Sequence, residues 1–454
     1  MTVVFANRAR LSAGWAADVS VKIENGRIAE IETGAAPAVD AVRVDTLLPA
    51  LANVHSHSFQ RAMAGMTEYR SSGRDTFWTW RELMYRFADK ITPDEIEAVA
   101  ALVFLEMQER GYASVGEFHY LHHQRGGAPY PALDELSQRI FAAAAATGIG
   151  LTLLPVLYIY GGAGKKPLAP EQLRFGNDVE RFNRLVAESR NKAKSVGADA
   201  RVGIAPHSLR ATSPDDLKRV IGLNPEGPIH IHIAEQPKEV TDVEAWLGAR
   251  PVEWLLANAP VDARWCLVHA THMTETETRS MAASGAVAGL CPITEANLGD
   301  GPFNGTLYLQ AGGAFGVGSD SNVRISLTEE LRTLEYAQRL RDLSRNVLAA
   351  GSASVGDTLY LGAAMGGARA LGREAGVIEA GRLADLVAID SKAPTLCALE
   401  DGRLLDGLCF AAGDDVVTDV WAAGRHTVRG GRHYARDQII ANYRKAVAAL
   451  LSDS

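Results

Sequence analysis

The sequence has few of the features that define several whole classes of protein. Its four cysteines stand far apart, at Cys266, Cys291, Cys397 and Cys409, whereas a zinc ribbon needs close cysteine pairs and a small disulfide scaffold needs many of them. We therefore interpret them as buried small residues. The chain has no run of about 18 apolar residues that could cross a membrane. Its start, MTVVFANRARLSAG, lacks the basic and apolar regions of a signal peptide. We expect a cytoplasmic protein that does not bind membranes.

Positive charge is also scarce. The 46 Lys and Arg residues, against 54 Asp and Glu residues, give a formal net charge of -8. The clustered basic residues occupy one short stretch, GRHTVRGGRHYAR, near the C-terminus. A chain without a basic field does not attract a polyanion, so no nucleic-acid partner is expected. The 454 residues contain no low-complexity segment and are 47% hydrophobic, which is enough for a large core in one big domain beside a smaller one.

Short apolar runs rich in β-forming residues alternate with longer amphipathic stretches through the middle of the chain. This alternation is typical of parallel βα folds. No glycine-rich phosphate loop follows the first run, which argues against an open doubly wound sheet. The number of candidate strands favours a (β/α)8 TIM barrel, an α/β fold, over residues 48–371. These strands span residues 46–54, 114–120, 149–159, 201–206, 228–234, 265–270, 286–292 and 313–320.

One helix between these strands can be predicted in detail, from the stretch TPDEIEAVAALVFLEMQERG. Thr92 is the expected N-cap, Pro93 the first helical residue and Glu95 the partner in a capping box. Gly111 should end the helix. Apolar side chains recur at helical spacing and should pack on the barrel. They are Ile96, Val99, Leu102, Val103 and Met107.

The two ends of the chain differ in kind from the middle. β-type segments at residues 2–11, 19–31, 384–390 and 417–433 are separated by turn residues such as Asn25-Gly26 and Gly430-Gly431. We predict a smaller β-sandwich domain built from both termini, over residues 1–47 and 372–436, with the barrel inserted between them. The last residues, 437–454, should form a C-terminal helix.

Two histidines, His55 and His57, end the first candidate strand in ANVHSHSFQR. Alternate residues of a strand point the same way, so both imidazoles could bind one ion. Barrel active sites form at the C-terminal ends of strands. Ligand-type residues recur there, with His232 in strand five, His269 at the end of strand six and Asp320 at the end of strand eight. One such residue is usually a cap or a satisfied polar group, but four strand ends of this kind indicate a metal site.

The predicted metal ligands are three imidazoles and one carboxylate, donors that suit zinc first and iron or manganese next. A divalent ion lowers the pKa of a bound water from about 15.7 to roughly 7, and so makes hydroxide available at neutral pH. We therefore expect a hydrolase with one divalent ion per chain, Zn2+ by preference. The ligands are His55, His57, His232 and Asp320.

Spacing leaves two of these assignments open. His230 and His232 lie on one face of strand five, and we choose His232 because Glu235 then follows at His-x-x-Glu spacing, where it can act as a proton shuttle. His269 could be a second-metal ligand or a hydrogen-bonding partner of the hydroxide. Strand four ends in His207 and offers no lysine or carboxylate to bridge two ions. A mononuclear site is therefore predicted.

These motifs resemble the amidohydrolase superfamily, in its mononuclear deaminase branch, over nearly the whole chain. The tail GVIEAGRLADLVAID resembles the segment by which such enzymes return from the barrel to the small β-domain. The stretches NVHSHSFQRAMAGMTEYR, DTFWTWRELMYRF, GEFHYLHH and APHSLRA resemble the N-formimino-L-glutamate deiminases of bacterial histidine degradation. That resemblance implies catalytic roles for Glu235, His269 and Asp320. It also implies substrate binding by Gln60, Arg81, Tyr120, His207 and Arg210.

The implied substrate fits the residues on physical grounds. Formiminoglutamate carries two carboxylates, and the guanidinium groups of Arg81 and Arg210 could each take one through paired hydrogen bonds. An arbitrary arginine is more often part of a surface ion pair, but these two follow strands one and four near the active rim. Tyr120 could equally be a core aromatic at the end of strand two. On this hypothesis metal-activated hydroxide, oriented by Asp320 and His269, attacks the formimino carbon, and Glu235 passes a proton to the departing nitrogen.

Alternatives remain at this stage. A deaminase of the same branch acting on a purine, pyrimidine or triazine would not need both arginines. A metal-binding or scaffold protein without activity would not need Glu235. The segment YGGAGKKPLAPEQL after strand three is either a lid or an ordinary surface loop. We also expect that the protein is a homodimer and that its substrate is a small molecule with two carboxylates.

Overall fold

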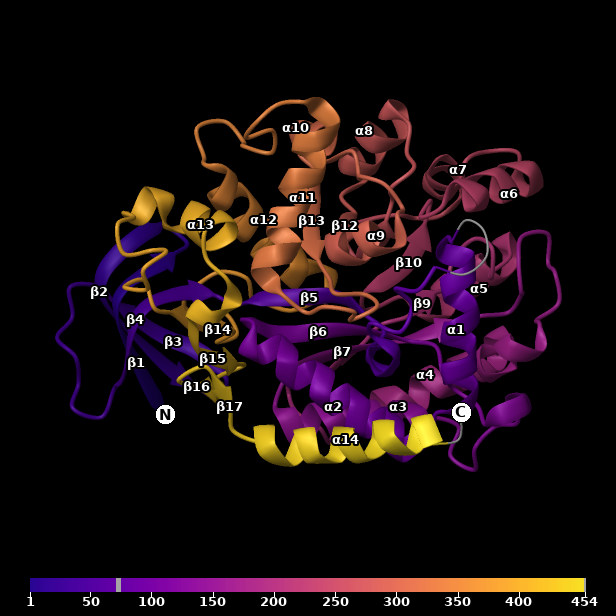
Figure 1. Ribbon diagram of the computed structural model, residues 1–454, viewed down its shortest axis with the longest axis horizontal. Coiled ribbons are helices and arrows are strands. Elements are labelled where there is room, and N and C mark those ends of the chain that lie inside the picture. Colours follow the sequence, from indigo (N-terminus) through magenta and orange to yellow (C-terminus); the bar gives the residue numbers. More distant parts are fainter. Residues whose placement is uncertain (71–74, 453–454) are drawn as a thin grey trace.

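The middle of the chain forms a closed barrel of parallel strands (Figure 1). The computed structural model describes residues 1–70 and 75–452. The barrel strands are β5 (Leu51–Ser56), β6 (Tyr112–His119), β7 (Gly150–Leu157), β8 (Arg201–Val202), β9 (Ala205–Pro206), β10 (Ile229–Ile233), β11 (Trp265–His269), β12 (Val287–Leu290) and β13 (Ala314–Val317). They pair in the order β10-β11-β12-β13-β5-β6-β7-β8, with β9 also on β7. A parallel bridge between Ile204 and Ile229 closes the ring.

The predicted barrel strands are present, but the first began too early in our prediction. Residues 46–49 belong to β4 (Val42–Pro49), a strand of the other sheet, and the barrel strand β5 starts only at Leu51. The chain changes sheet at Ala50, whose amide donates to the carbonyl of Asp385. Because the residues on both sides of Ala50 are apolar and buried, the hydrophobic pattern gives no sign of this change.

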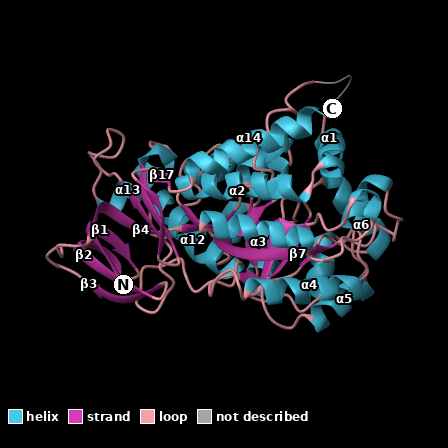
Figure 2. Ribbon diagram, turned by 90° about the horizontal axis from the view of Figure 1, so that it is seen from below, coloured by secondary structure: helices cyan, strands magenta, loops and turns pink. Residues whose placement is uncertain are grey.

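Helices connect the strands and cover the barrel (Figure 2). Those along the barrel are α1 (Phe77–Lys90), α2 (Pro93–Glu109), α3 (Glu135–Thr147), α4 (Val179–Ala193), α5 (Pro214–Leu223), α6 (Pro237–Leu247), α7 (Pro251–Asn258), α8 (Glu275–Ser284), α9 (Pro292–Leu298), α10 (Gly305–Gln310), α11 (Leu327–Asp342) and α12 (Val355–Ala370). The helix α13 (Asp401–Phe410) follows in the C-terminal part. Together the strands and helices bury a large apolar core, and a second, smaller cluster includes Val54, Val268 and Val287 of the barrel strands.

Helix α2 confirms the detailed prediction from its sequence. The Thr92 hydroxyl accepts the amide of Glu95, and the Glu95 carboxylate accepts the amide of Thr92 in return. The helix ends at Glu109, and Gly111 takes a left-handed φ of 92° two residues later, a conformation that favours glycine. The predicted apolar stripe, from Ile96 to Met107, is buried.

The two ends of the chain build a second sheet (Figure 1). Its strands are β1 (Thr2–Leu11), β2 (Gly14–Glu24), β3 (Arg27–Glu32), β4, β14 (Leu386–Ile389), β15 (Val417–Ala422), β16 (Arg425–Arg429) and β17 (Arg432–His433), in the order β17-β16-β15-β14-β4-β1-β2-β3. The sheet curls until the turn at Gly26 meets the turn at Ala423, where a Cβ on Gly26 would lie 2.9 Å from the Ala423 carbonyl oxygen. The small β-domain is thus one curled sheet with its own core.

The last helix, α14 (Arg436–Ser452), lies against α2 on the outside of the barrel (Figure 2). Residues 453 and 454 of the predicted helix fall outside the described part of the chain. The exact domain limits at residues 47/48, 371/372 and 436/437 stay predictions. Among the described residues, no helix is both long enough and apolar enough to cross a membrane.

A buried ionic network joins the barrel to the small sheet. The Arg373 guanidinium, whose side chain is 0% exposed, lies 3.0 Å from Asp385 and 3.2 Å from Asp199. Asp199 precedes β8 of the barrel and also binds Arg425 of β16 at 2.8 Å. Asp385 in addition accepts the amide of Ala423. The network therefore holds segments of both domains in one geometry.

We expect that Arg373→Met destabilises the fold strongly. The substitution leaves the buried Asp385 without its cation and Asp199 with Arg425 alone, and the loss of one partner of a buried pair typically costs about 3–5 kcal/mol. The midpoint of urea unfolding measures the effect. Arg382→Met is the matched control, because the pair of Arg382 with Glu379 is about half exposed and exposed pairs contribute only about 0–1 kcal/mol. Equal midpoints for the two variants would contradict a stabilising role for the network.

Candidate active site

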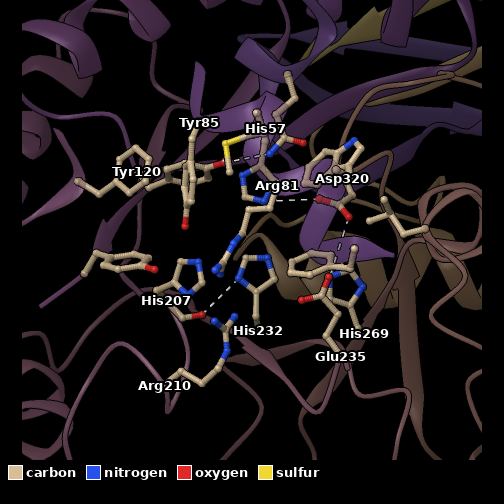
Figure 3. A pocket seen from close by; sticks show the side chains of 17 residues that line it. His57, Arg81, Tyr85, Tyr120, His207, Arg210, His232, Glu235, His269 and Asp320 are labelled. Carbon is tan, nitrogen blue, oxygen red and sulfur yellow. Dashed lines mark hydrogen bonds and ion pairs between the residues drawn. The ribbon is translucent and has the colours of Figure 1, made fainter. Parts of the chain in front are cut away.

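A single pocket at the C-terminal ends of the barrel strands gathers the predicted site residues (Figure 3). It is lined by His57, Gln60, Arg81, Tyr120, His207, Arg210, His232, Glu235, His269 and Asp320. His55 lies just beneath them, with its Nε2 atom 3.2 Å from that of His57 and 3.0 Å from that of His232. The structure therefore brings together every residue that the sequence placed in the site.

The predicted metal ligands converge on one small volume. The Asp320 carboxylate lies 3.5 Å from Nε2 of His55 and 3.4 Å from Nε2 of His57. The ligand atoms form two sets that share His55, one with His57 and Asp320 and the other with His232 and His269, and all of these side chains are almost completely buried. Imidazoles and a carboxylate in this arrangement fit a divalent ion. The site belongs to a metal-dependent protein.

The far sides of two ligand rings are held by backbone carbonyls. Nδ1 of His57 lies 2.9 Å from the carbonyl oxygen of Phe118, and Nδ1 of His232 lies 3.2 Å from that of His207. These contacts put the proton on Nδ1 and leave the Nε2 lone pair for a metal ion. Burial lowers the pKa of His55 to about 3 and also lowers those of His57 and His232. Neutral imidazoles, the form that binds metal ions, therefore prevail at physiological pH.

Closure of the barrel places Asp320 among these histidines. The Asp320 amide donates to the His55 carbonyl, and the His57 amide donates to the Asp320 carbonyl, at 2.9 and 2.8 Å. Asp320 has a left-handed φ of 45°, and the strand ends at Ala234 and His269 also have positive φ values, of 51° and 66°. Backbone strain of this kind gathers at functional sites. Although burial opposes it, contacts with the histidines keep the pKa of Asp320 below its ordinary value.

His230 and His232 lie at different depths in the barrel. Both side chains point into the barrel, but His230 lies two residues earlier, roughly 7 Å lower along the strand axis. There its Nε2 atom contacts the carbonyl oxygen of Ala370 at 2.8 Å. His232 instead reaches the layer of His55.

Glu235 and His269 face each other beside the predicted metal ligands, and the ring of His269 stacks on that of His232 at 5.5 Å. Nε2 of His269 lies 3.7 Å from the Glu235 carboxylate and 3.9 Å from that of Asp320. Burial raises the pKa of Glu235 to about 7, although the charge of His269 opposes the rise. Burial disfavours a charged His269, but Glu235, Glu295 and Asp320 together raise its pKa to about 10. A carboxyl group that titrates near neutrality suits proton transfer.

The other end of the pocket is cationic. Arg81 on α1 lies over the rings of Trp78 and Tyr85, at 4.6 and 5.3 Å. Arg210 is only 6% exposed, and its Nε has no hydrogen-bond partner among the described residues. Within residues 1–70 and 75–452, no carboxylate lies within 4.0 Å of either guanidinium. Burial opposes the charge of Arg210, but Glu239 and Glu235 raise its pKa. The buried Arg210 and the half-buried Arg81 thus offer two guanidinium groups to an anionic ligand.

Neutral polar groups complete the lining. The Gln60 amide, on the 3-10 helix η1 (Ser58–Met63), donates to the Tyr120 hydroxyl at 2.9 Å. Tyr120 is therefore more than a core aromatic, because its hydroxyl belongs to a polar chain at the pocket wall. His207 stands between the two ends of the pocket, with its ring centroid 5.0 Å from that of His232 and 4.6 Å from that of Tyr158.

Sequence reasoning missed several residues of the site. Glu295 on α9 accepts from Nδ1 of His269 at 3.2 Å, and this contact turns the other ring nitrogen toward Glu235. Tyr85 and Tyr158 also line the pocket. One available signal was a stripe of large side chains at helical spacing on α1 that faces the pocket. It comprises Phe77, Trp80, Arg81, Met84 and Tyr85. Nothing local marks Glu295.

Comparison with known proteins assigns the chain to a family. The amidohydrolase family matches residues 46–427, and the N-terminal domain of the formimidoylglutamate deiminase HutF matches residues 1–43. A formimidoylglutamate deiminase of Pseudomonas aeruginosa is 48% identical over 455 aligned residues, which cover 99% of this chain and 100% of the relative.

Solved structures agree with this assignment. An amidohydrolase from Brucella melitensis is 49% identical and superposes with a TM-score of 0.96, over 99% of this chain and 100% of that one. An adenosine deaminase from Xanthomonas campestris, solved with bound zinc, shares the fold at 23% identity, with a TM-score of 0.82 over 99% and 98% of the two chains. Since the family match spans the barrel and the deiminase relative aligns with almost the whole chain, this protein belongs to the amidohydrolase family and, within it, to the formimidoylglutamate deiminases.

Proposed function

We propose that this chain hydrolyses N-formimino-L-glutamate to N-formyl-L-glutamate and ammonia, a step of histidine degradation. The observation that carries the proposal is the pair Arg81 and Arg210, which enter the pocket of Glu235 with no carboxylate within 4.0 Å among the described residues. Two unpaired guanidinium groups match a substrate with two carboxylates. A neutral heterocycle would leave both without a partner. The name of the Pseudomonas relative supports the same activity.

The ion that we propose for the ligand cluster is zinc, one per chain. The donor set of His55, His57, His232 and Asp320 suits it, and the adenosine deaminase relative contains it. A divalent ion at this place supplies a water whose pKa is lowered to roughly 7. From the sequence alone, we also propose that the protein is located in the cytoplasm and that it assembles as a homodimer.

The chain's own residues then move two protons, one after the other. The Asp320 carboxylate and Nε2 of His269 orient the attacking water beside the formimino carbon. As the new C–O bond forms, Glu235 takes a proton from that water and passes it to the terminal nitrogen of the formimino group. Glu235 then passes the proton of the new hydroxyl group to the same nitrogen, the C–N bond to that nitrogen breaks, ammonia leaves and the formyl group stays on glutamate. A pKa near 7 lets Glu235 act in both directions at neutral pH.

Glu235→Gln should lower kcat by on the order of 10²–10⁴-fold, because the amide can no longer accept the proton. Ammonia release and metal content are measured on the same sample, and the metal content should not change. Glu244→Gln, on the exposed face of α6, is the control and should behave like the wild type. Full activity of the Glu235 variant would remove this residue from the mechanism.

Removal of the ion by a chelator should abolish ammonia release, and addition of about one Zn2+ per chain should restore it. His232→Ala should lower the metal content. His269→Asn should retain one ion per chain yet lose activity, because His269 is held by Glu295 and faces the reacting groups. His230→Gln serves as the control for a buried histidine outside the site. Loss of the ion in the His269 variant would make His269 a ligand.

Arg210→Gln should lower kcat/KM for N-formimino-L-glutamate roughly tenfold to hundredfold, since it removes a charged hydrogen-bonding partner of a carboxylate. The unfolding temperature of this variant should not fall, because the group it loses is buried without a carboxylate partner among the described residues. Arg219→Gln, on the exposed part of α5, is the control. Unchanged kcat/KM, together with turnover of guanine, adenosine or cytosine, would favour the heterocycle alternative.

A further inference from the structure

Two tyrosines that nothing above has given a role lie beside the unpaired arginines. Tyr158 follows β7 and is 4% exposed, and Tyr85 is on α1; both line the pocket. The charges of Arg210 and Arg81 both act on the Tyr158 hydroxyl, whose pKa burial nevertheless raises above its ordinary value. This hydroxyl therefore keeps its proton at neutral pH and can serve as a hydrogen-bond donor.

The hydroxyl oxygens of both tyrosines are held by one amide. Nε2 of Gln172, on the 3-10 helix η3 (Pro170–Phe175), lies 3.0 Å from Oη of Tyr158 and 3.2 Å from Oη of Tyr85. Oε1 of Gln172 accepts the amide of Ala169 at 2.9 Å. That contact determines which end of the side chain is the carbonyl, so the NH2 group must face the tyrosines. Gln172 is only 3% exposed and is therefore held in this orientation.

The direction of these hydrogen bonds decides where the tyrosine protons go. Both phenol oxygens accept from Gln172, so neither donates its own proton to it. The two hydroxyls are also close enough to interact with each other, and that contact can use one of the two protons. At least one proton is left over. Within the described chain, neither tyrosine hydroxyl donates this remaining proton to a protein acceptor.

We propose that Tyr85 and Tyr158 donate a hydrogen bond to one carboxylate of the substrate, beside Arg81 and Arg210, and that Gln172 is the positioning residue that turns their protons toward it. The inference rests on the proposed function, because it needs a carboxylate in the pocket. It also gives a role to the segment at residues 160–173, which the sequence left as lid or surface loop. Gln172, near the end of this segment, stands behind the two tyrosines that line the pocket.

The test compares kcat and KM of the wild type with those of the double variant Tyr85→Phe/Tyr158→Phe. Loss of a hydrogen bond to a charged group should raise KM for N-formimino-L-glutamate roughly tenfold to hundredfold, with kcat changed by less. Each single variant should show a smaller rise, since the other hydroxyl still has a proton to give. Tyr160→Phe is the matched control, because its hydroxyl binds Asp216 outside the pocket.

Two substrate analogues, each lacking one of the two carboxylates, separate binding from a general structural effect. For the analogue that lacks the carboxylate bound by the tyrosines, the double variant and the wild type should have the same KM. A KM that is unchanged for the full substrate, or one that rises equally for all three compounds, would overturn the inference. If the wild type releases no ammonia from N-formimino-L-glutamate, the proposed function itself fails, which is a distinct result.

Gln172→Glu tests the positioning role with almost no change in size. A carboxylate accepts hydrogen bonds and cannot donate them, so both tyrosine protons should turn away from the pocket. We expect a rise in KM at least as large as that of the double variant, with the same dependence on the analogue and with an unchanged unfolding temperature and metal content. A wild-type KM would show that Gln172 does not orient the hydroxyls.

Discussion

The active site depends on the pairing of the first barrel strand with the last. Two reciprocal backbone hydrogen bonds join Asp320 to His55 and His57, although more than half of the chain lies between these residues. Side chains alternate between the faces of a strand, so a register shift of one residue would turn the ligands away from the pocket. The metal site is therefore a consequence of exact barrel closure.

Burial then shifts the pKa values of the groups at the metal end of the pocket in opposite directions. It keeps the ligand histidines neutral and raises the pKa of Glu235 toward neutrality, because a low-dielectric environment disfavours either charge. At the other end, no carboxylate lies within 4.0 Å of Arg81 or Arg210 in the described chain. The substrate would supply the missing negative charge.

Local signals were sufficient for most of the architecture. The capping box of Thr92 and Glu95 and the apolar stripe of α2 depend on residues within one helix, and the structure reproduces them. The first barrel strand was placed wrongly because the sequence is apolar on both sides of Ala50, where the chain passes from one sheet to the other. Glu295 was missed because its contact with His269 depends on the packing of α9 against β11 and on no periodicity in the chain.

The sequence by itself determined the kind of chemistry, because it contains the ligand-type residues and places them at the ends of successive strands. Strand periodicity also put His55 and His57 on one face. Only the tertiary structure decided which of His230 and His232 reaches the ligand layer, which groups orient His269, and that Tyr85, Tyr158 and Gln172 stand behind the arginines. These outcomes depend on depth within the barrel and on contacts between distant segments, and neither is encoded in local spacing.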